Sequence, residues 1–462
     1  MEKAKKAIGR KMKTAKKPPK TKSDGEKPKK VYIPGRSRDL KKDEELICDE
    51  SAYTMLHSFD TVSPCLSFDP LPDKMGEKRD SYPAFCYLVT GTQAEKIRDN
   101  KIMVMKLTNL HKNKTKEKEK KDDDDEEESE SSDSEDEEGE KPVLFSAAIN
   151  HHGGINRIRS TQINETPICA VWNDQSKVQI WKIDTLLSMV DNLEEKIKNE
   201  SDTRTDVSLS DEKPLFSFSG HPCEGYALDW SPMSLGKLLS GDNRKNIHLW
   251  TMTEGGQWTV DQRPFNAHLS SVEDIQWSPN EDNVFASCSS DKTMRLWDSR
   301  VPPHQACICT VENAHDGDVN VISWNPVDPL LVSGGDDCAL KIWDLKFIQN
   351  GHPVANFKHH TKAITSVHWY KHDSTVFAAA GADNQVTIWD LAVEPDDEME
   401  VEQKESEPSS SEKDSGEKVP PQLMFLHAGQ EEIKEVRWHP QLCGTAISTA
   451  LDGFNVFRPV NF

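Results

Sequence analysis

Short apolar runs with the two-residue alternation of β-strands recur at a nearly constant interval in the second half of the chain. Four of these runs end in a tryptophan, at Trp250, Trp297, Trp343 and Trp389, and successive members are 46 or 47 residues apart. Alternation of apolar and polar positions predicts strands that are buried on one face. A period of this length indicates an array in which each repeat is one small β-sheet.

Each repeat carries further positions in a constant order. A histidine comes first, then a second tryptophan usually followed by Ser-Pro or Asn-Pro, and then an aspartate after small residues. We predict three structural sets: His268, Asp291 and Trp297; His315, Asp336 and Trp343; and His360, Asp383 and Trp389. This pattern is typical of the WD-repeat propeller, whose blades have four strands. A set that recurs in every blade suits a buried hydrogen-bond network and not a catalytic site.

Degenerate repeats extend the array on both sides. Residues 151–183 keep Asp174 and Trp181, residues 427–458 keep Asp452, and residues 65–110 contain three strand-like runs without the signature. Polar insertions at 112–141, 187–213 and 394–419 interrupt the array, and we expect them to be disordered. Without them, residues 65–462 are 315 positions, or seven blades of 45. We therefore predict an all-β, seven-bladed propeller over residues 65–462.

The segment 47–64 precedes this propeller, and its pattern predicts a helix. Tyr53, Leu56 and Phe59 are three residues apart and would share one helical face. We expect this N-terminal helix to lead into the first blade and to pack partly on the propeller wall. Residues 1–46 are expected to form a separate, disordered basic arm.

Charge is concentrated in a few segments. The formal net charge is −22; residues 122–140 contain 14 carboxylates and no base, and residues 394–418 contribute a further −8. Residues 1–30 hold 13 Lys/Arg against three acids. Blocks of like charge stay solvated and commonly serve as interaction tails.

The acidic run is predicted to hold a very basic client through loose, salt-sensitive contacts. The residues assigned to this role are Asp122, Asp125, Glu128, Asp133, Asp136 and Glu138. The alternative is a solvated insertion that only aids solubility. Ser132 and Ser134 have acids three residues later and are candidate phosphorylation sites, where a phosphate would deepen the charge.

The basic arm is predicted to act in nuclear import through Lys16, Lys17, Lys20, Lys29 and Lys30. The alternative is contact with RNA or DNA phosphates. The arm has no aromatic residue before Tyr32, so base stacking is not expected there. The acidic body also argues against a propeller that binds nucleic acid directly.

Several classes of protein and site are excluded by what the sequence lacks. No apolar run approaches the roughly 18 residues that span a bilayer, and the first residues lack the apolar core of a secretory signal. The ten cysteines show no zinc-type spacing, and a disulfide framework is not expected. No phosphate loop or nucleophile elbow occurs either. We expect no enzyme, no cofactor and no metal, and a reducing compartment.

From residue 48 onward the sequence resembles the glutamate-rich WD-repeat proteins. CDESAYTMLH at 48–57, GTQAE at 91–95, KLTNLH at 106–111 and HHGGINRIR at 151–159 carry this resemblance, together with the acidic run. It implies a nuclear and nucleolar scaffold and chaperone that acts in large ribosomal subunit assembly. The implied partners are a large-subunit ribosomal protein, pre-ribosomal particles, histones and chromatin. The protein is expected to be a monomer.

A more distant resemblance links the chain to the retinoblastoma-associated histone-binding WD proteins. The segment before the first blade and VPPQLMFLHAG at 419–429 carry it. In those relatives the corresponding helix and Pro-Pro loop form a groove that takes a client helix. Carried over by position, this partner-binding groove would use Leu56, Phe59, Asp414, Glu417, Pro420, Pro421 and Leu423.

A last motif defines an alternative function. Trp297-Asp298-Ser299-Arg300 resembles the WD-x-R signature that docks some WD proteins onto the adaptor of cullin-type ubiquitin ligases. Asp298 and Arg300 would then belong to a substrate receptor, although the aspartate also suits a purely structural role. A further alternative is an RNA-binding ribosome assembly factor that acts through the basic arm.

Overall fold

The computed structural model describes residues 46–113, 141–199, 204–210, 212–393 and 419–462, with Tyr32 and Ser37. The chain divides into residues 1–46 and residues 47–462, and all of the described strands lie in the second unit. The following predicted sites lie outside the described residues: the import lysines, the acidic run with Ser132 and Ser134, and the groove residues Asp414 and Glu417.

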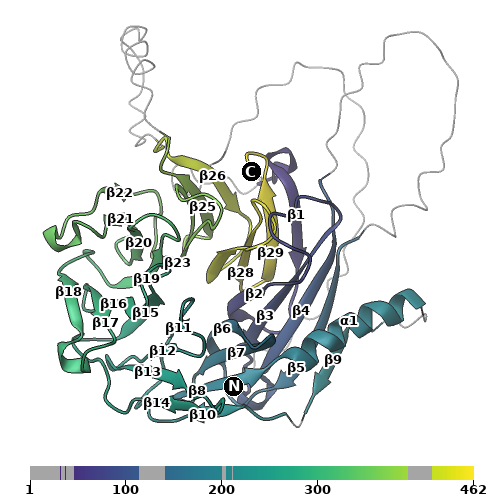
Figure 1. Cartoon of the computed structure of the whole chain (residues 1–462). Helices are drawn as coiled ribbons and strands as arrows, with labels where there is room; N and C mark the ends of the chain where they lie inside the picture. The colour runs from purple at the N-terminus through teal and green to yellow at the C-terminus, as the bar shows by residue number, and fades with distance from the viewer. Residues whose placement is uncertain are drawn as a thin grey trace, which may run out of the picture. The chain divides into compact units, whose positions relative to one another are not determined.

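Seven β-sheets are arranged around a common axis, and each is one blade of a propeller (Figure 1). The first blade contains β2 (Cys65–Leu71), β3 (Ala84–Thr92), β4 (Lys101–Leu110), β5 (Val143–Asn150) and β9 (Asp206–Leu209). The second contains β6 (Ile155–Ile163), β7 (Thr166–Asn173), β8 (Lys177–Lys182) and β10 (Phe216–Phe218). Neighbouring strands are antiparallel, except that β9 is parallel to β5.

The next four blades each take four consecutive strands. The third has β11 (Ala227–Trp230), β12 (Leu238–Gly241), β13 (Ile247–Met252) and β14 (Trp258–Val260). The fourth has β15 (Val272–Trp277), β16 (Val284–Ser289), β17 (Met294–Asp298) and β18 (Cys307–Val311). The fifth has β19 (Val319–Trp324), β20 (Leu330–Gly335), β21 (Leu340–Asp344) and β22 (Ala355–Phe357). The sixth has β23 (Ile364–Trp369), β24 (Val376–Gly381), β25 (Gln385–Asp390) and β26 (Leu423–Ala428).

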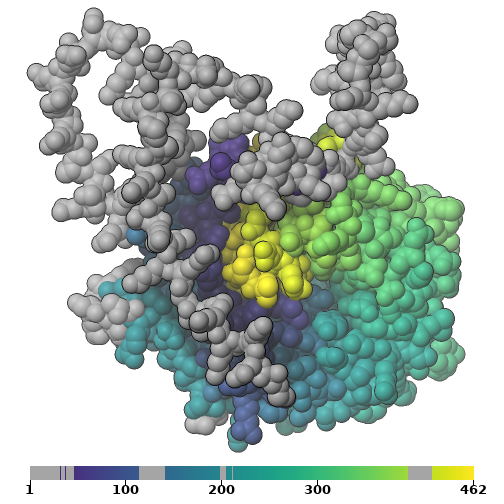
Figure 2. Space-filling view, turned by 180° about the vertical axis from the view of Figure 1, so that it is seen from behind, coloured from purple at the N-terminus to yellow at the C-terminus, as the bar shows by residue number. Residues whose placement is uncertain are grey.

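The seventh blade joins the two ends of the propeller. It contains β27 (Glu435–Trp438), β28 (Ala446–Ala450), β29 (Gly453–Pro459) and, as its outermost strand, β1 (Tyr53–Phe59). Figure 2 shows the yellow C-terminal residues beside the purple N-terminal ones. By pairing with β29, β1 covers a sheet edge that would otherwise be free to pair with another chain.

The first strand of every blade faces the axis and contacts its counterparts in the neighbouring blades. These inner strands are β2, β6, β11, β15, β19, β23 and β27, and contact between β27 and β2 closes the ring. In most blades the inner strand begins beside the turns with the repeated histidine and aspartate, and ends at a tryptophan or proline. We call these two ends of the axial channel the histidine face and the proline face.

The predicted helix at 47–64 is wrong. Only Glu50–Ala52 (η1) forms a short 3₁₀ turn, and Tyr53–Phe59 is strand β1. Tyr53, Met55 and Phe59 are buried, as alternation in a strand requires. An irregularity in the pairing with β29 between Tyr53 and Met55 adds one residue, so that Tyr53 and Leu56 contact the same cluster. The three-residue spacing that suggested a helix comes partly from this bulge.

The prediction of disorder over 187–213 is also wrong for the residues described there. Asp184–Asn199 forms α1, which lies against β4 and β5, and Asp206–Leu209 forms β9 (Figure 1). Leu186 and Val190 are buried in the blade cluster. These positions are four residues apart and fall on one helical face, although the segment is polar on average. The remaining described helices are 3₁₀ turns: η2 (Ile97–Asp99), η4 (Pro303–Gln305) and η5 (Ile348–Asn350).

The repeated histidines, aspartates and tryptophans form buried relays within blades. In the fourth blade, His268 Nδ1 lies 3.0 Å from Asp291 and its Nε2 lies 2.7 Å from Ser287 Oγ, which also accepts the Trp297 indole N–H. In the sixth blade, His360 bonds Asp383 and Thr387, and the Thr387 hydroxyl accepts the Trp389 indole N–H. Each relay ties the loop before an inner strand to the second or third strand of the same blade.

One predicted relay member is corrected. His315 Nδ1 bonds Asp337 at 2.8 Å and not Asp336, which is exposed and accepts from Asn320. Asp337 lies six residues before Trp343, the same interval that separates Asp291 from Trp297 and Asp383 from Trp389. The turn between β20 and β21 therefore places the second aspartate of the pair toward the histidine.

Candidate functional site in the axial channel

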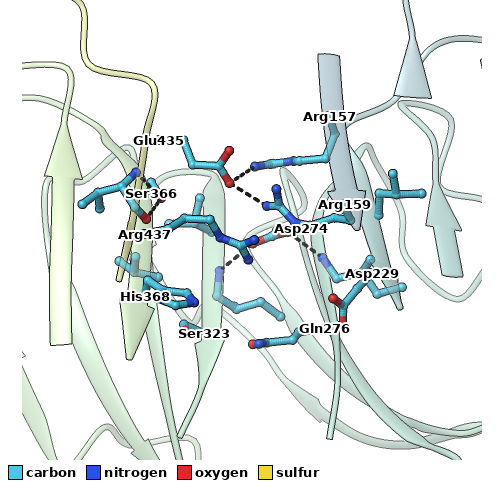
Figure 3. Close-up of a pocket in the computed structure, with 16 residues that line it drawn as sticks. Arg157, Arg159, Asp229, Asp274, Gln276, Ser323, Ser366, His368, Glu435 and Arg437 are labelled. Atoms are coloured by element: carbon cyan, nitrogen blue, oxygen red, sulfur yellow. Dashed lines mark hydrogen bonds and ion pairs between the residues drawn. The ribbon is translucent and has the colours of Figure 1, made fainter. Parts of the chain in front are cut away.

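The axial channel is lined by polar and charged side chains (Figure 3). They come from alternate positions of six inner strands: Arg157, Arg159, Asp229, Asp274, Gln276, Ser323, Ser366, His368, Glu435 and Arg437. Because side chains alternate along a strand, the intervening positions point into the blades, where they are apolar. The alternation thus produces a charged channel inside a ring of apolar clusters.

Glu435 lies at the centre of the charge network. Its carboxylate accepts from Arg159 Nη2 at 2.6 Å and from Arg157 Nη1 at 3.4 Å, and it also accepts the Phe68 backbone N–H at 2.9 Å. Burial opposes ionisation of Glu435, but the charges of Arg159, Arg157 and Arg437 outweigh it and lower its pKa to about 2. Glu435 is therefore ionised and links blades two and seven.

Two carboxylates in the channel differ from Glu435. Asp229 accepts the Trp277 backbone N–H at 2.8 Å, and Asp274 accepts the backbone N–H groups of Ile275 and Ile322. Within the described part of the chain, neither forms an ion pair, since Arg157 and Arg159 pair with Glu435 and Arg437 with Asp69. Burial raises the pKa of Asp229 to about 7 and also raises that of Asp274.

Carboxylates also gather around the histidine face. Glu224, Glu273, Asp318 and Asp336 lie in or beside the loops at the starts of inner strands β11, β15 and β19 and in the β20–β21 turn. Burial and then the charge of Asp318 raise the pKa of Glu273, and burial and then Asp336 raise that of Asp318. Carboxylates whose charges raise the pKa of a neighbour are incompletely neutralised, so this rim attracts cations.

The proline face has a different character. A cavity of about 300 Å³ opens there, and its walls are indole rings and prolines. The tryptophans are Trp230, Trp277, Trp324, Trp369 and Trp438. The prolines are Pro232, Pro279, Pro326 and Pro440. The sequence shows the recurrent Trp-x-Pro, but nothing local in it reveals that these residues from different blades meet around one cavity.

The residues of the predicted side groove are only partly brought together. Leu56 is half-buried in a cluster with Tyr53 and Phe425, whereas Phe59 is buried on the other side of β1, in the cluster of the first blade. Leu423 packs against the sixth-blade cluster, Pro420 is half-buried and Pro421 is exposed. Leu56 and Phe59 therefore do not present a common face, because β1 is a strand.

The WD-x-R residues lie at the end of β17. Arg300 is exposed and donates from Nε and Nη2 to the Asp298 carboxylate, at 2.8 Å and 2.6 Å. Among the described residues, no group of three or more His, Cys, Asp or Glu side chains could hold a metal ion, and no helix is long and apolar enough to cross a bilayer.

Known proteins resemble this chain over nearly its whole length. The Arabidopsis thaliana protein named HEAT STRESS TOLERANT DWD 1 is 42% identical over 445 residues, covering 94% of this chain and 92% of that protein. The Schizosaccharomyces pombe ribosome assembly protein rrb1 is 40% identical over 450 residues, covering 95% and 86%. The Dictyostelium discoideum glutamate-rich WD repeat-containing protein 1 is 43% identical over 443 residues, covering 95% and 87%.

Two family models match parts of the chain. The model described as histone-binding protein RBBP4 or a component of the CAF1 complex matches residues 43–111, which include β1 to β4. The model of the WD domain, G-beta repeat, matches residues 260–298, 305–344 and 351–390, which contain the relays of the fourth to sixth blades. With the near full-length relatives, these matches show that the chain belongs to the family of glutamate-rich WD-repeat proteins.

Proposed function

We propose that the protein is a non-enzymatic nuclear scaffold and chaperone that escorts basic proteins during large ribosomal subunit assembly and also binds histones. The observation that carries the proposal is the row of carboxylates on the histidine face, where burial and the charge of Asp318 raise the pKa of Glu273. A basic partner segment would relieve this repulsion by supplying the missing positive charge.

The names of the relatives support the cellular setting of this proposal. One near full-length relative is named a ribosome assembly protein, and the family model that matches residues 43–111 is named for histone binding. The acidic run at 122–140 adds 14 carboxylates to the same chain. We propose that this run attracts the client over a distance and that the histidine face holds it.

The test is affinity purification of the tagged full chain from nuclear extract, with and without nuclease. We expect a large-subunit ribosomal protein and histones to be recovered in stoichiometric amounts and to persist after nuclease treatment. Deletion of residues 122–140, or the pair Glu273→Gln and Asp318→Asn, should lower recovery several-fold at 150 mM salt. The matched control is Glu165→Gln with Glu254→Gln, which removes two exposed charges from loops away from this rim.

Unchanged recovery in both the deletion and the histidine-face variant would overturn the proposal. Loss of partners on nuclease treatment would instead favour the alternative of an RNA-binding assembly factor. In that case Lys16, Lys17, Lys20, Lys29 and Lys30 would crosslink to RNA, whereas we propose that these lysines serve nuclear import. We also propose Ser132 and Ser134 as phosphorylation sites that strengthen client binding.

A specific observation favours a second candidate function. Arg300 is exposed and held by Asp298, so a charged fork is presented at the end of β17. In a substrate receptor of a cullin-type ligase, this fork would contact the adaptor. Arg300→Ala should then abolish co-purification of the adaptor while the client is retained, and retention of the adaptor by this variant would count against the role.

The side groove also remains a proposal in modified form. Leu56 contacts the cluster that contains Phe425, and Pro421 is exposed at the start of β26, so these residues can border one site between β1 and β26. Phe59 would contribute only by fixing β1 in place. Exchange of Pro421 for Glu should weaken binding of a basic amphipathic helix if the site is used.

A further inference from the structure

The proline-face cavity has rigid walls. Three of its tryptophans donate their indole N–H to a carbonyl on the inner strand of the preceding blade. The pairs are Trp230 to Arg159 at 3.0 Å, Trp369 to Ser323 at 2.9 Å, and Trp438 to His368 at 3.1 Å. Because these bonds fix the rings, the cavity is preorganised and a ligand would not have to order its walls.

Asp229 supplies the polar floor of this cavity. It borders both the proline-face cavity and the inner channel, and its carboxylate accepts the Trp277 backbone N–H at 2.8 Å. No ion pair reaches it from any residue that the structure describes. A buried carboxylate without a cation is costly, and a well-placed cation offsets that cost. The floor therefore favours a positive charge that enters from outside.

The basic groups of the protein that border the cavity do not supply this charge. Lys371 at the rim is exposed and pairs with Glu77 at 2.8 Å. His368 Nδ1 accepts the Trp438 backbone N–H at 3.2 Å, which requires an unprotonated nitrogen, and burial lowers the pKa of His368 to about 3. The imidazole is therefore neutral, and Asp229 is left to an external partner.

We propose that this cavity binds one arginine side chain of a basic partner segment, with the guanidinium at Asp229 and the aliphatic stem between the indoles. A volume of about 300 Å³ accommodates one long side chain. The guanidinium is more weakly hydrated than an ammonium, stacks on aromatic faces and pairs with a carboxylate through two N–H groups. These properties match a site with tryptophan walls and a carboxylate floor.

The rim of the cavity suits the segment that would carry the arginine. Met233, Leu235 and Val327 are 51%, 66% and 66% exposed in the loops that follow β11 and β19. Glu281 and Asp373 are exposed in the corresponding loops of the fourth and sixth blades. Exposed apolar and acidic side chains around a pocket fit a short basic peptide with apolar residues. This inference rests on the proposed function for the class of partner, but it concerns the opposite end of the channel.

The test uses the full chain and the probe acetyl-Ala-Ala-Arg-Ala-Ala-amide, with citrulline and lysine counterparts, titrated at pH 8 by tryptophan fluorescence and calorimetry. We expect the arginine probe to bind at least tenfold more tightly than the neutral citrulline probe and more tightly than the lysine probe. Asp229→Asn should abolish the preference for arginine over citrulline. Equal binding of arginine and citrulline, or an unchanged preference in Asp229→Asn, would overturn the proposal. A lysine probe that binds as tightly as arginine would overturn the choice of arginine.

Two further variants separate this site from folding effects and from the proposed function. Val327→Lys places a positive charge at the rim without touching the interior and should weaken the arginine probe several-fold, whereas Val354→Lys, at an equally exposed position before β22, should not. The pair Glu273→Gln and Asp318→Asn should leave the probe unaffected. If that pair releases basic clients while the probe still binds, the histidine-face proposal and the proline-face inference are supported independently. If the pair also weakens the probe, the inference is contradicted.

Discussion

Arg159 and Glu435 are 276 positions apart in the sequence and form an ion pair of 2.6 Å in the axial channel. The pair joins β6 of the second blade to β27 of the seventh, across the junction that closes the ring. Each residue is buried, so each charge depends on the other for compensation. The functional channel and the closure of the fold therefore share the same side chains.

Removal of the acidic partner should destabilise the propeller. Glu435→Gln would leave Arg159 and Arg157 buried without their carboxylate, and breaking a buried pair in this way costs about 3 kcal/mol or more. Denaturant unfolding should show this loss, while Glu432→Gln, an exposed neighbour three positions earlier, should change the free energy of unfolding by less than about 0.5 kcal/mol. Equal stability of the two variants would contradict the assigned role of Glu435.

Asp229 should have the opposite effect on stability, in a pH-dependent manner. Burial raises its pKa to about 7, against an unfolded value of about 3.9, so between pH 4 and 7 the folded state binds more protons than the unfolded state. Stability is therefore lost as the pH rises through this window. Asp229→Asn removes the ionisation and its amide oxygen can still accept the Trp277 N–H, so the variant should be more stable by about 3 kcal/mol at pH 8.

The advantage of Asp229→Asn should fade as the pH falls, and near pH 4 the two proteins should unfold at similar temperatures. Thermal unfolding from pH 4 to 8 measures this difference. A constant difference across the range would show that the carboxyl does not titrate in the channel. Added stability together with lost arginine binding would be hard to explain by a purely structural role for Asp229.

The two adjacent aspartates of the fifth blade should differ sharply. Asp337 accepts from His315 and from two backbone N–H groups, so Asp337→Ala leaves a buried imidazole and turn amides without their acceptor. We expect a loss of about 2 kcal/mol. Asp336→Ala is the matched control and should be near neutral, because that carboxylate is exposed. The reverse order in thermal unfolding would restore the assignment made from the sequence.

The N-terminal strand should contribute strongly to stability. Phe59 is buried among Phe68, Leu88 and Phe454, in the cluster where β1 meets the first blade. Phe59→Ala should lower the free energy of unfolding by about 3 kcal/mol, whereas Ser58→Ala on the exposed side should have little effect. A small effect of Phe59→Ala would mean that closure by β1 is dispensable.

The sequence predicts what repeats and misses what depends on contact between distant segments. Trp297 and Asp291 follow a periodic pattern, so the blades and most of their relays could be found. Asp337 was missed because the small-residue run ends in two aspartates, although the six-residue interval to Trp343 identifies the correct one. Phe59 was assigned to a helix because a bulge in β1 imitates helical spacing.

The channel itself could not be derived from local patterns. Arg159, Asp229 and Glu435 belong to different blades, and only ring closure brings them together. Arg159 lies in the degenerate second repeat, whose alternation predicts a strand but not its partner. The pocket between the tryptophans likewise requires the proline face to be assembled. Periodicity therefore predicts the scaffold, whereas the candidate site arises from its closure.

The most direct test of the central claim is the affinity of the full chain for a purified core histone, measured by calorimetry at 150 mM and 500 mM salt. Wild type and the control pair Glu165→Gln with Glu254→Gln should bind equally and lose affinity at high salt. Glu273→Gln with Asp318→Asn should bind at least tenfold more weakly at 150 mM salt, with unchanged thermal stability. Equal affinity of the histidine-face variant and wild type would contradict the claim that this acidic rim holds basic partners.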